Sequence, residues 1–305
     1  MNSQRKSTLL AHLAVMGANI IYGINYVVAK GIMPDFMQPR MIILLRVTGA
    51  ALIFWSVASF YPRQRVDLKD KIRIAFCALF GIAINQVMFF EGLNMTTPIN
   101  ASIIMVGTPI LVLLFSHFIL NDRLSKQKVF GILLGFSGAA FLILQGGKLS
   151  LASGTFMGNL FVFINASSYG LFLVLIKPLM KKYSPITLMK WLFTFGLFYI
   201  IPVSFFFVNK TDFAAIPTTI WFSIAYVIIF TTVLAYFLNN YSLKKISPTM
   251  NSAYIYLQPF LATVVALIAG KDRLTWVEIL AAALIFTGVY FVNFSPKSTD
   301  AVKDI

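Results

Sequence analysis

Residues 92–141 read GLNMTTPINASIIMVGTPILVLLFSHFILNDRLSKQKVFGILLGFSGAAF, and residues 242–291 read SLKKISPTMNSAYIYLQPFLATVVALIAGKDRLTWVEILAAALIFTGVYF. Aligned without a gap, they share features in the same order: Pro98 with Pro248, Pro109 with Pro259, Asp122-Arg123-Leu124 with Asp272-Arg273-Leu274, and Gly138 with Gly288. Each pair is separated by 150 positions, the distance from residue 92 to residue 242. An ordered duplication of this length indicates an internal structural repeat.

A weaker duplication extends the repeat toward the N-terminus. The matching residues, 147 positions apart, are Tyr22-Gly23 and Lys30 in the first copy and Tyr169-Gly170 and Lys177 in the second. We therefore predict two domains, residues 1–147 and 148–305, each containing one copy. The stretch Gln145–Ser153 is rich in Gly and Ser and is the predicted joint between them.

The composition is that of a membrane protein. Hydrophobic residues make up 59% of the 305 residues and charged residues only 11%, with a mean hydropathy of +0.83. Because a soluble domain carries about 25% charged residues, we expect an integral membrane protein. The net charge of +15 comes mainly from Lys and Arg in short segments between apolar runs. This distribution favours membrane lipid headgroups as partners and argues against nucleic acid.

Ten apolar runs are long enough to cross a bilayer as helices, which takes about 20 residues each. They lie near residues 9–29, 40–60, 72–91, 98–119, 127–145, 155–176, 186–208, 217–240, 248–269 and 275–294. The runs lack the alternating pattern of a membrane β-barrel. The predicted fold class is therefore all-α, with ten transmembrane helices joined by short loops.

Basic residues outside these runs indicate the orientation. With a cytoplasmic N-terminus, seventeen Lys and Arg residues face the cytoplasm and six face outward. This bias predicts that both termini are cytoplasmic. Five spans separate the two copies of the repeat, and because five is odd, equivalent helices cross the membrane in opposite directions. We therefore predict two inverted five-helix repeats, a construction typical of alternating-access transporters.

Polar side chains recur inside the predicted spans, where exposure to lipid is costly. Asn251, Tyr254 and Gln258, for example, are spaced to share one face of a helix. The predicted cavity residues are Tyr22, Asn25, Arg46, Asn85, Gln86, Asn165, Tyr169, Tyr236, Asn239, Asn251, Tyr254 and Gln258. Aromatic walls with a few amides suit a small amphiphilic or zwitterionic solute. For any one of these residues, the alternative role is a hydrogen bond between helices.

Two charged residues of the predicted spans, Arg46 and Glu91, are candidates for a gate or an ion pair. Arg46 lies about two turns into the second span, and Glu91 lies at the external end of the third. One hypothesis is that Arg46 attracts a substrate carboxylate or gates the outer mouth of a cavity. The other is a structural role, in an ion pair with Glu91 or a contact with a backbone carbonyl.

Pro109 and Pro259 lie in the middle of predicted spans, where proline removes a backbone hydrogen bond and kinks the helix. They are candidate hinges, with a static bend as the alternative. Their equivalent positions in the two copies favour a common role in both halves.

The spans offer no chemistry for an enzyme. They contain no nucleophile–base pair and no cluster of His, Asp and Glu side chains, so we expect no catalytic residue, no metal site and no cofactor. No Walker loop is present, which argues against ATP as a partner.

The ordered duplication resembles the EamA family of the drug/metabolite transporter superfamily. The residues concerned are Thr97-Pro98, Pro109, Asp122-Arg123-Leu124 and Gly138, followed by Ser247-Pro248, Pro259, Asp272-Arg273-Leu274 and Gly288. The segment YGINYVVAK (Tyr22–Lys30) and the pair Leu45-Arg46 also resemble family positions. The family more often has Glu where this chain has Asp122 and Asp272.

The resemblance implies a multi-pass carrier in a bacterial-type inner (cytoplasmic) membrane. It also implies a small-molecule substrate, often an amino acid or related metabolite moved outward. An activated sugar or a lipid-linked group is the alternative substrate, and a channel or a membrane-embedded enzyme is the alternative class. We expect a monomer, with a homodimer as the alternative.

Overall fold

A computed structural model describes residues 3–120, 125–144, 154–270 and 273–293. Within these ranges the chain is helical and contains no strand. The predicted joint Gln145–Ser153, the segment Asp122-Arg123-Leu124 and Asp272 lie outside the described residues.

The elements follow one another along the chain as one long series of helices. Their bounds are α1 (Ser3–Ile32), α2 (Pro39–Ser59), α3 (Leu68–Ala78), η1 (Leu79–Ile84), α4 (Asn85–Met95), α5 (Pro98–Met105), α6 (Thr108–Leu120), α7 (Lys126–Leu144), α8 (Gly154–Lys182), α9 (Pro185–Ser204), η2 (Phe205–Phe207), α10 (Thr218–Tyr226), η3 (Val227–Leu234), α11 (Ala235–Lys245), α12 (Pro248–Ser252), η4 (Ala253–Tyr256), α13 (Leu257–Ile268) and α14 (Trp276–Asn293). Of the short elements, η1 and η3 are π-helices, and η2 and η4 are 3₁₀-helices.

Eight helical stretches of the described chain are long and apolar enough to cross a membrane. They are Ser7–Ile32, Pro39–Ser59, Leu68–Met95, Pro98–Ile119, Gly154–Lys182, Pro185–Phe207, Thr218–Lys245 and Pro248–Ile268. The two remaining predicted spans, 127–145 and 275–294, fall on α7 and α14. The prediction of an all-helical membrane protein is thereby confirmed.

Three helices begin with the same local signal, a Ser or Thr followed by proline. The pairs are Thr97-Pro98 at α5, Ser184-Pro185 at α9 and Ser247-Pro248 at α12. In each, the cap hydroxyl accepts a hydrogen bond at 3.1–3.2 Å from the backbone N–H three residues later. Proline suits the first helical position because its missing N–H has no partner to lose there. The repeated turns at Thr97 and Ser247 are therefore helix starts.

The duplicated prolines lie just after interruptions of their helices. α5 ends at Met105, and Pro109 lies in the first turn of α6. Pro259 lies in the first turn of α13, directly after the 3₁₀-helix η4. A proline ring clashes with the carbonyl four residues earlier, which is residue 105 or 255. Each proline therefore breaks regular α-helix instead of only bending it.

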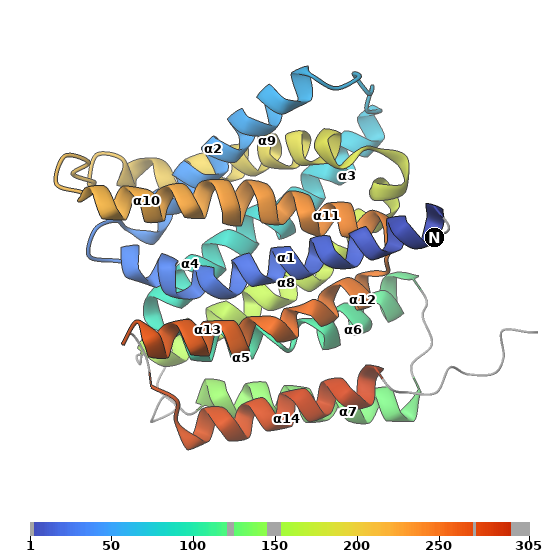
Figure 1. The fold of residues 1–305 in the computed structure, drawn as a ribbon, viewed down its shortest axis with the longest axis vertical. Coiled ribbons are helices and arrows are strands. Elements are labelled where there is room, and N and C mark those ends of the chain that lie inside the picture. The colour runs from blue at the N-terminus through green and yellow to red at the C-terminus, as the bar shows by residue number, and fades with distance from the viewer. Residues whose placement is uncertain (1–2, 121–124, 145–153, 271–272, 294–305) are drawn as a thin grey trace, which may run out of the picture.

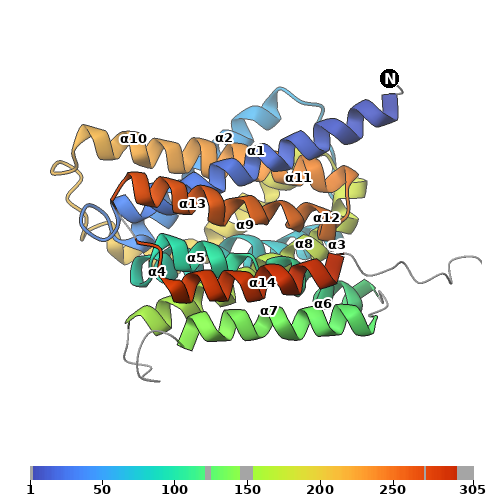
Figure 2. The same ribbon diagram turned by 60° about the horizontal axis from the view of Figure 1, so that its bottom comes forward.

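Helices of the two copies pack in matched pairs. By the sequence repeat, α1 corresponds to α8, α2 to α9, α3–α4 to α10–α11, α5–α6 to α12–α13, and α7 to α14. The matched contacts are α1–α11 with α8–α4, α1–α13 with α8–α6, and α2–η3 with α9–η1, beside the direct pairs α2–α9 and α7–α14. Figure 1 shows α7 and α14 side by side along the lower edge and α2 near α9 toward the upper edge, and Figure 2 again has α7 beside α14.

Glycine allows the closest approach in the α7–α14 pair. A Cβ atom added to Gly288 would lie 2.6 Å from the Gly131 carbonyl oxygen, and one added to Gly138 would lie 3.0 Å from the Ala281 carbonyl oxygen. Small residues let membrane helices pack backbone to backbone. The duplicated glycines of the sequence therefore meet in one interface, where each copy contributes the same position.

Candidate functional site

A small polar cavity of about 60 Å³ lies where helices of both halves meet. Nine of the twelve predicted cavity residues line it: Tyr22, Asn25, Arg46, Asn85, Gln86, Asn165, Tyr169, Tyr236 and Gln258. Five further residues complete the lining: Tyr26, Phe89, Phe90, Met105 and Thr231. A space of this size holds a few water molecules, since each requires about 10–15 Å³.

The π-helices η1 and η3 occupy overlapping positions of the two repeats, since Leu79 corresponds to residue 229 at the spacing of 150. Their irregular backbone is satisfied by side chains. The hydroxyls of Ser168 and Tyr236 donate to the carbonyls of Phe80 and Gly81 at 2.6 and 3.1 Å, and Thr232 donates to the Val227 carbonyl at 2.7 Å. π-Helical segments inside α-helices are frequent at functional sites. The sequence contained no signal for them.

Tyr236 is the centre of a hydrogen-bond network beside η1. Its hydroxyl accepts from Gln86 Nε2 at 2.9 Å and lies 3.2 Å from Asn85 Oδ1. The Tyr236 ring packs edge-on against Tyr22, with centroids 6.3 Å apart. Asn165 Nδ2 donates to the Asn85 backbone carbonyl at 2.8 Å. Two side chains of the second half, those of Tyr236 and Asn165, thereby fix the position of Asn85 and Gln86 in the first half.

A second network joins α1 to α13 on the other side of the cavity. The Tyr26 hydroxyl donates to Gln258 Oε1 at 2.9 Å, and Gln258 Nε2 donates to Asn19 Oδ1 at 2.6 Å. Thr231 donates to Asn25 Oδ1 at 3.1 Å. Asn19 and Asn25 of α1 are therefore held in place by side chains of the second half.

Arg46 is buried, with 3% of its surface exposed, but it has no carboxylate partner among the described residues. Its Nε donates to the Thr232 hydroxyl at 2.7 Å, and its guanidinium carbon lies 4.6 Å from the centre of the Phe90 ring. Glu91 instead pairs with Arg40 at 2.8 Å. The hypothesis of an ion pair between Arg46 and Glu91 is therefore wrong. Arg40 lies six residues nearer the start of α2, about 9 Å along the helix, which brings it level with Glu91.

Three predicted cavity residues lie outside the lining. Asn239 Nδ2 donates to the hydroxyl of Tyr169, a lining residue, at 2.6 Å, and Asn251 Nδ2 donates to the Asn239 carbonyl at 3.3 Å. Asn239 thus supports a lining residue directly, and Asn251 does so through Asn239. The Tyr254 hydroxyl bonds to His12 Nδ1 at 2.8 Å in a separate cluster. The 3₁₀-helix η4 changes the predicted stripe of Asn251, Tyr254 and Gln258, because four residues at 120° instead of 100° add about 80° of rotation. The angle between Asn251 and Gln258 around the helix axis thereby grows from about 20° to about 60°.

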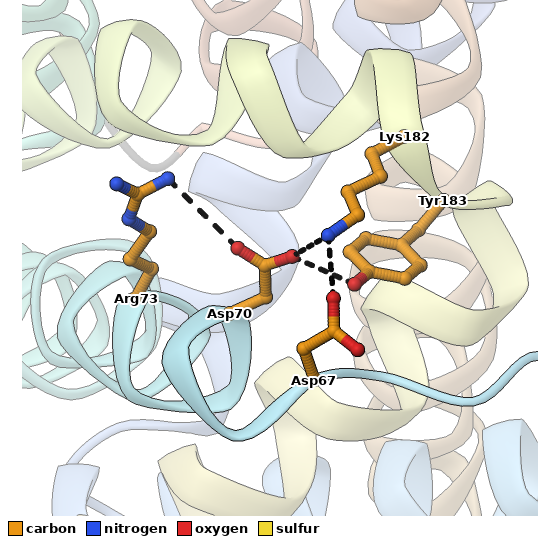
Figure 3. Close-up of polar contacts among 5 residues, drawn as sticks. All are labelled: Asp67, Asp70, Arg73, Lys182 and Tyr183. Carbon is orange, nitrogen blue, oxygen red and sulfur yellow. Dashed lines mark hydrogen bonds and ion pairs between the residues drawn. The ribbon is translucent and has the colours of Figure 1, made fainter.

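An ion cluster lies at the predicted cytoplasmic end and joins the start of α3 to the end of α8 (Figure 3). Asp70, only 8% exposed in its side chain, accepts from Lys182 Nζ at 2.5 Å and from the Tyr183 hydroxyl at 2.7 Å. Lys182 also pairs with the exposed Asp67 at 2.7 Å, and Arg73 lies 3.8 Å from Asp70. Sequence reasoning missed this cluster, since its charges looked like ordinary loop residues.

The equivalent loops at the opposite end are arranged differently. Residues 34–38, before α2, and residues 210–216, before α10, line a cavity of about 260 Å³. Asp35, Lys210 and Asp212 lie on this cavity, yet none of them forms an ion pair with another described residue. Among the described residues, ion pairs thus join the two halves at the Asp70–Lys182 end but not at the end formed by these loops.

Two lysines of the weaker repeat make equivalent contacts at opposite ends. Lys30 Nζ donates to the carbonyls of Leu93 and Asn94 at 3.0 and 2.7 Å, near the end of α4. Lys177 Nζ donates to the carbonyls of Leu243 and Ile246, at and just beyond the end of α11. The last carbonyls of a helix lack partners within the helix, and a cation there is favourable.

The EamA-like transporter family matches residues 9–144 and, in a second copy, residues 156–294. The chain belongs to the EamA-like transporter family. The resemblance inferred from the duplicated motifs is thereby confirmed. This family member is a multi-pass membrane transporter. Among its described residues, no group of three His, Cys, Asp or Glu side chains could hold a metal ion.

Individual relatives agree with the family assignment. The chain is 25% identical over 281 residues to the uncharacterized transporter YyaM of Bacillus subtilis (strain 168), covering 91% of this chain and 92% of that protein. It is 23% identical over 250 residues, 82% of each chain, to a protein of Streptantibioticus cattleyicolor named "Probable terminal-alkyne amino-acid exporter". A crystal structure with 18% identity matches 95% of this chain and 97% of its own with a TM-score of 0.65, which supports the fold alone.

Proposed function

We propose that this chain is a secondary carrier that exports small organic metabolites, such as amino acids or related amphiphilic compounds, by alternating access. The observation on which the proposal rests is the polar cavity, which takes its lining from both halves. A site between two halves can be exposed to either side of the membrane when the halves move relative to each other. Relatives named as transporters favour this function over an enzyme.

The proposed architecture is ten transmembrane helices in two inverted five-helix repeats, residues 1–147 and 148–305, with both termini in the cytoplasm. The two separate family matches support this division. So do the matched helix pairs and the equivalent contacts of Lys30 and Lys177, which cap helices at opposite ends. The bias of Lys and Arg toward one side supports the orientation. The proposed location is a bacterial-type inner membrane.

The chemistry of the cavity supports a small substrate with an apolar body. Phe89, Phe90 and Met105 provide an apolar surface, while tyrosines and amides provide oriented hydrogen-bond partners. The naming of one relative as an amino-acid exporter supports the same class and the outward direction. The cavity is too small to admit such a solute without some separation of the helices around it.

The ion cluster is the contact that alternating access would have to break. In the proposed orientation, the Asp70–Lys182 ion pair joins the two halves at the cytoplasmic end, whereas the Arg40–Glu91 ion pair at the external end lies within the first half. This asymmetry supports a conformation that is closed toward the cytoplasm. Loading from the cytoplasm then requires separation of α3 from the end of α8.

Counterflow in proteoliposomes tests the proposal. Vesicles loaded with an unlabelled amino acid are diluted into the same labelled compound, over a panel of amino acids and with and without a pH gradient. A carrier produces a transient accumulation of label that saturates with concentration. Vesicles without protein are the control. Flux that rises linearly with concentration and shows no counterflow for any solute would rule out a carrier.

A further inference from the structure

The cavity contains one permanent charge and no charge to balance it. Arg46 is the sole Lys, Arg, Asp or Glu side chain in the described lining. Of its five N–H donors, the one on Nε is used by Thr232, and the two terminal nitrogens make no hydrogen bond to a described residue. A buried charge without a partner is strongly unfavourable. The two terminal nitrogens are arranged to bind a planar anion such as a carboxylate through paired hydrogen bonds.

The same cavity also has two hydrogen-bond acceptors without donors. Gln86 Oε1 and Asn165 Oδ1 are fully buried and have no partner, and both residues line the cavity. A buried acceptor without a donor is costly, because it has lost its water. The cavity therefore favours a solute that supplies donors as well as an anion.

The hydrogen bonds of the two amides fix which atom is the acceptor. One end of the Asn165 amide faces the backbone carbonyl of Asn85. Because a carbonyl only accepts, this end must be the NH₂ group, and Oδ1 is left without a donor. The Tyr236 hydroxyl lies beside the Gly81 carbonyl and Asn85 Oδ1, so its proton faces an oxygen and it must accept from Gln86 Nε2. Neither amide can be reversed without bringing like groups together.

We propose that the cavity binds the head group of a zwitterionic α-amino acid, with the carboxylate on Arg46 and the ammonium on Gln86 Oε1 and Asn165 Oδ1. This inference rests on the proposed function, narrows its substrates to zwitterionic α-amino acids and assigns the residues that bind each charged group. A simple carboxylic acid satisfies Arg46 but leaves both amide oxygens without donors. A simple amine donates to the oxygens but adds a second cation beside Arg46. An amino acid provides both groups and leaves the occupied cavity with the charge of Arg46 alone.

Matched ligand triplets test the assignment on purified protein in detergent. Binding is measured by calorimetry for phenylalanine, for phenethylamine, which lacks the carboxylate, and for 3-phenylpropionate, which lacks the ammonium. Leucine and threonine with their corresponding analogues extend the set to other side chains. We expect at least one amino acid to bind at least tenfold more tightly than both of its analogues.

Variants separate the two parts of the site by a crossed pattern. Arg46→Gln should lower the affinities for the amino acid and for the acid by a similar factor. The affinity for the amine should be unchanged or higher. Gln86→Met or Asn165→Val should lower the affinities for the amino acid and for the amine and leave the affinity for the acid unchanged. A variant that merely folds poorly would weaken all three ligands together, and its melting temperature would show this. Arg40→Gln, which removes the partly exposed pair with Glu91, is the control and should preserve the wild-type order of affinities.

The outcomes distinguish this inference from the function on which it rests. Equal affinities for an amino acid and its acid analogue would contradict the ammonium site. Equal affinities for an amino acid and its amine analogue would contradict carboxylate binding by Arg46. Failure of every amino acid to bind, with saturable counterflow of another solute, would overturn the inference and leave a carrier. Failure of counterflow for every solute would instead contradict the proposed function.

Discussion

A single hydroxyl group, that of Tyr236, joins both halves of the cavity wall. It contacts the amides of Asn85 and Gln86 and the Gly81 carbonyl within the π-helix η1. A hydroxyl with several buried partners contributes more to stability than a single average hydrogen bond, because its removal leaves all of these partners unsatisfied. This hydroxyl therefore links the geometry of η1 to the position of Gln86, one of the residues of the proposed ligand site.

Tyr236→Phe should impair both folding and transport. We expect a loss of about 1–3 kcal/mol in the free energy of unfolding, since Gln86 Nε2 and the Gly81 carbonyl lose a buried partner. Reversible unfolding in detergent measures stability, and counterflow measures transport. The matched control is Tyr241→Phe on the same helix, whose half-buried ring stacks on Phe237 and whose hydroxyl makes no hydrogen bond to a described residue. Similar losses in the two variants would contradict the special role of Tyr236.

Sequence reasoning located most of the cavity residues for a simple physical reason. A polar side chain in an apolar helix avoids lipid, so residues such as Asn85 and Tyr169 were expected in the interior. The same reason applies equally to Asn239 and Asn251, which bond to other protein groups behind the wall. Lining and bracing residues have the same chemistry, and only the packing of the helices separates them.

At the scale of elements, apolar run length predicted where the helices lie but not their irregularities. The π-helix η1 depends on hydroxyls from Ser168 and Tyr236, which are 88 and 155 residues away from the carbonyls they contact. No local sequence pattern records such distant partners. The interruptions at Pro109 and Pro259 were easier to predict from the sequence, because proline disrupts the helix in which it lies. Their role as hinges remains a prediction.

Replacement of either repeated lysine should weaken the end of the helix that it caps. Lys30→Met leaves the Leu93 and Asn94 carbonyls near the end of α4 without this donor, and Lys177→Met does the same at α11. We expect each variant to lose about 1–3 kcal/mol in the free energy of unfolding. Reversible unfolding of the single and double variants measures the losses.

The symmetry of the fold sharpens this test. Because the two lysine contacts are equivalent and share no residue, their losses should be similar in size and add in the double variant. Lys69→Met is the control, since Lys69 is exposed and its side chain forms no hydrogen bond or ion pair with a described residue. A large loss in only one lysine variant would contradict their equivalence.

At the scale of the whole molecule, the repeat predicted which helices are equivalent, and the contacts between them occur in matched pairs. The difference between the two ends was not predictable. The relevant positions hold unlike residues, with Lys182 and Tyr183 at one end and Asp35 and Phe36 at the spacing of 147. In the proposed inverted arrangement, unequal ends would favour one of the two alternating conformations over the other.

Asp70→Asn should shift the protein toward a conformation open to the cytoplasm. The substitution removes the charge that holds Lys182 at 2.5 Å, and the exposure of this lysine limits the size of the effect. We expect the ratio of open to closed molecules to rise by roughly fivefold or more. A Met105→Cys reporter in the cavity, in a Cys77→Ala background, measures the shift. Its labelling by an impermeant thiol reagent from the cytoplasmic side should accelerate by a similar factor.

Asp67→Asn provides the control for this shift because Asp67 pairs with the same lysine but is 69% exposed. Exposed ion pairs contribute little, typically about 0–1 kcal/mol, so its labelling rate should change less than about fivefold. Equal acceleration in the two variants would mean that burial of Asp70 does not matter. An unchanged rate in Asp70→Asn would mean that the cluster does not hold the cytoplasmic end closed. Acceleration from the external side alone would reverse the proposed orientation, because the cluster would then close the opposite face of the membrane.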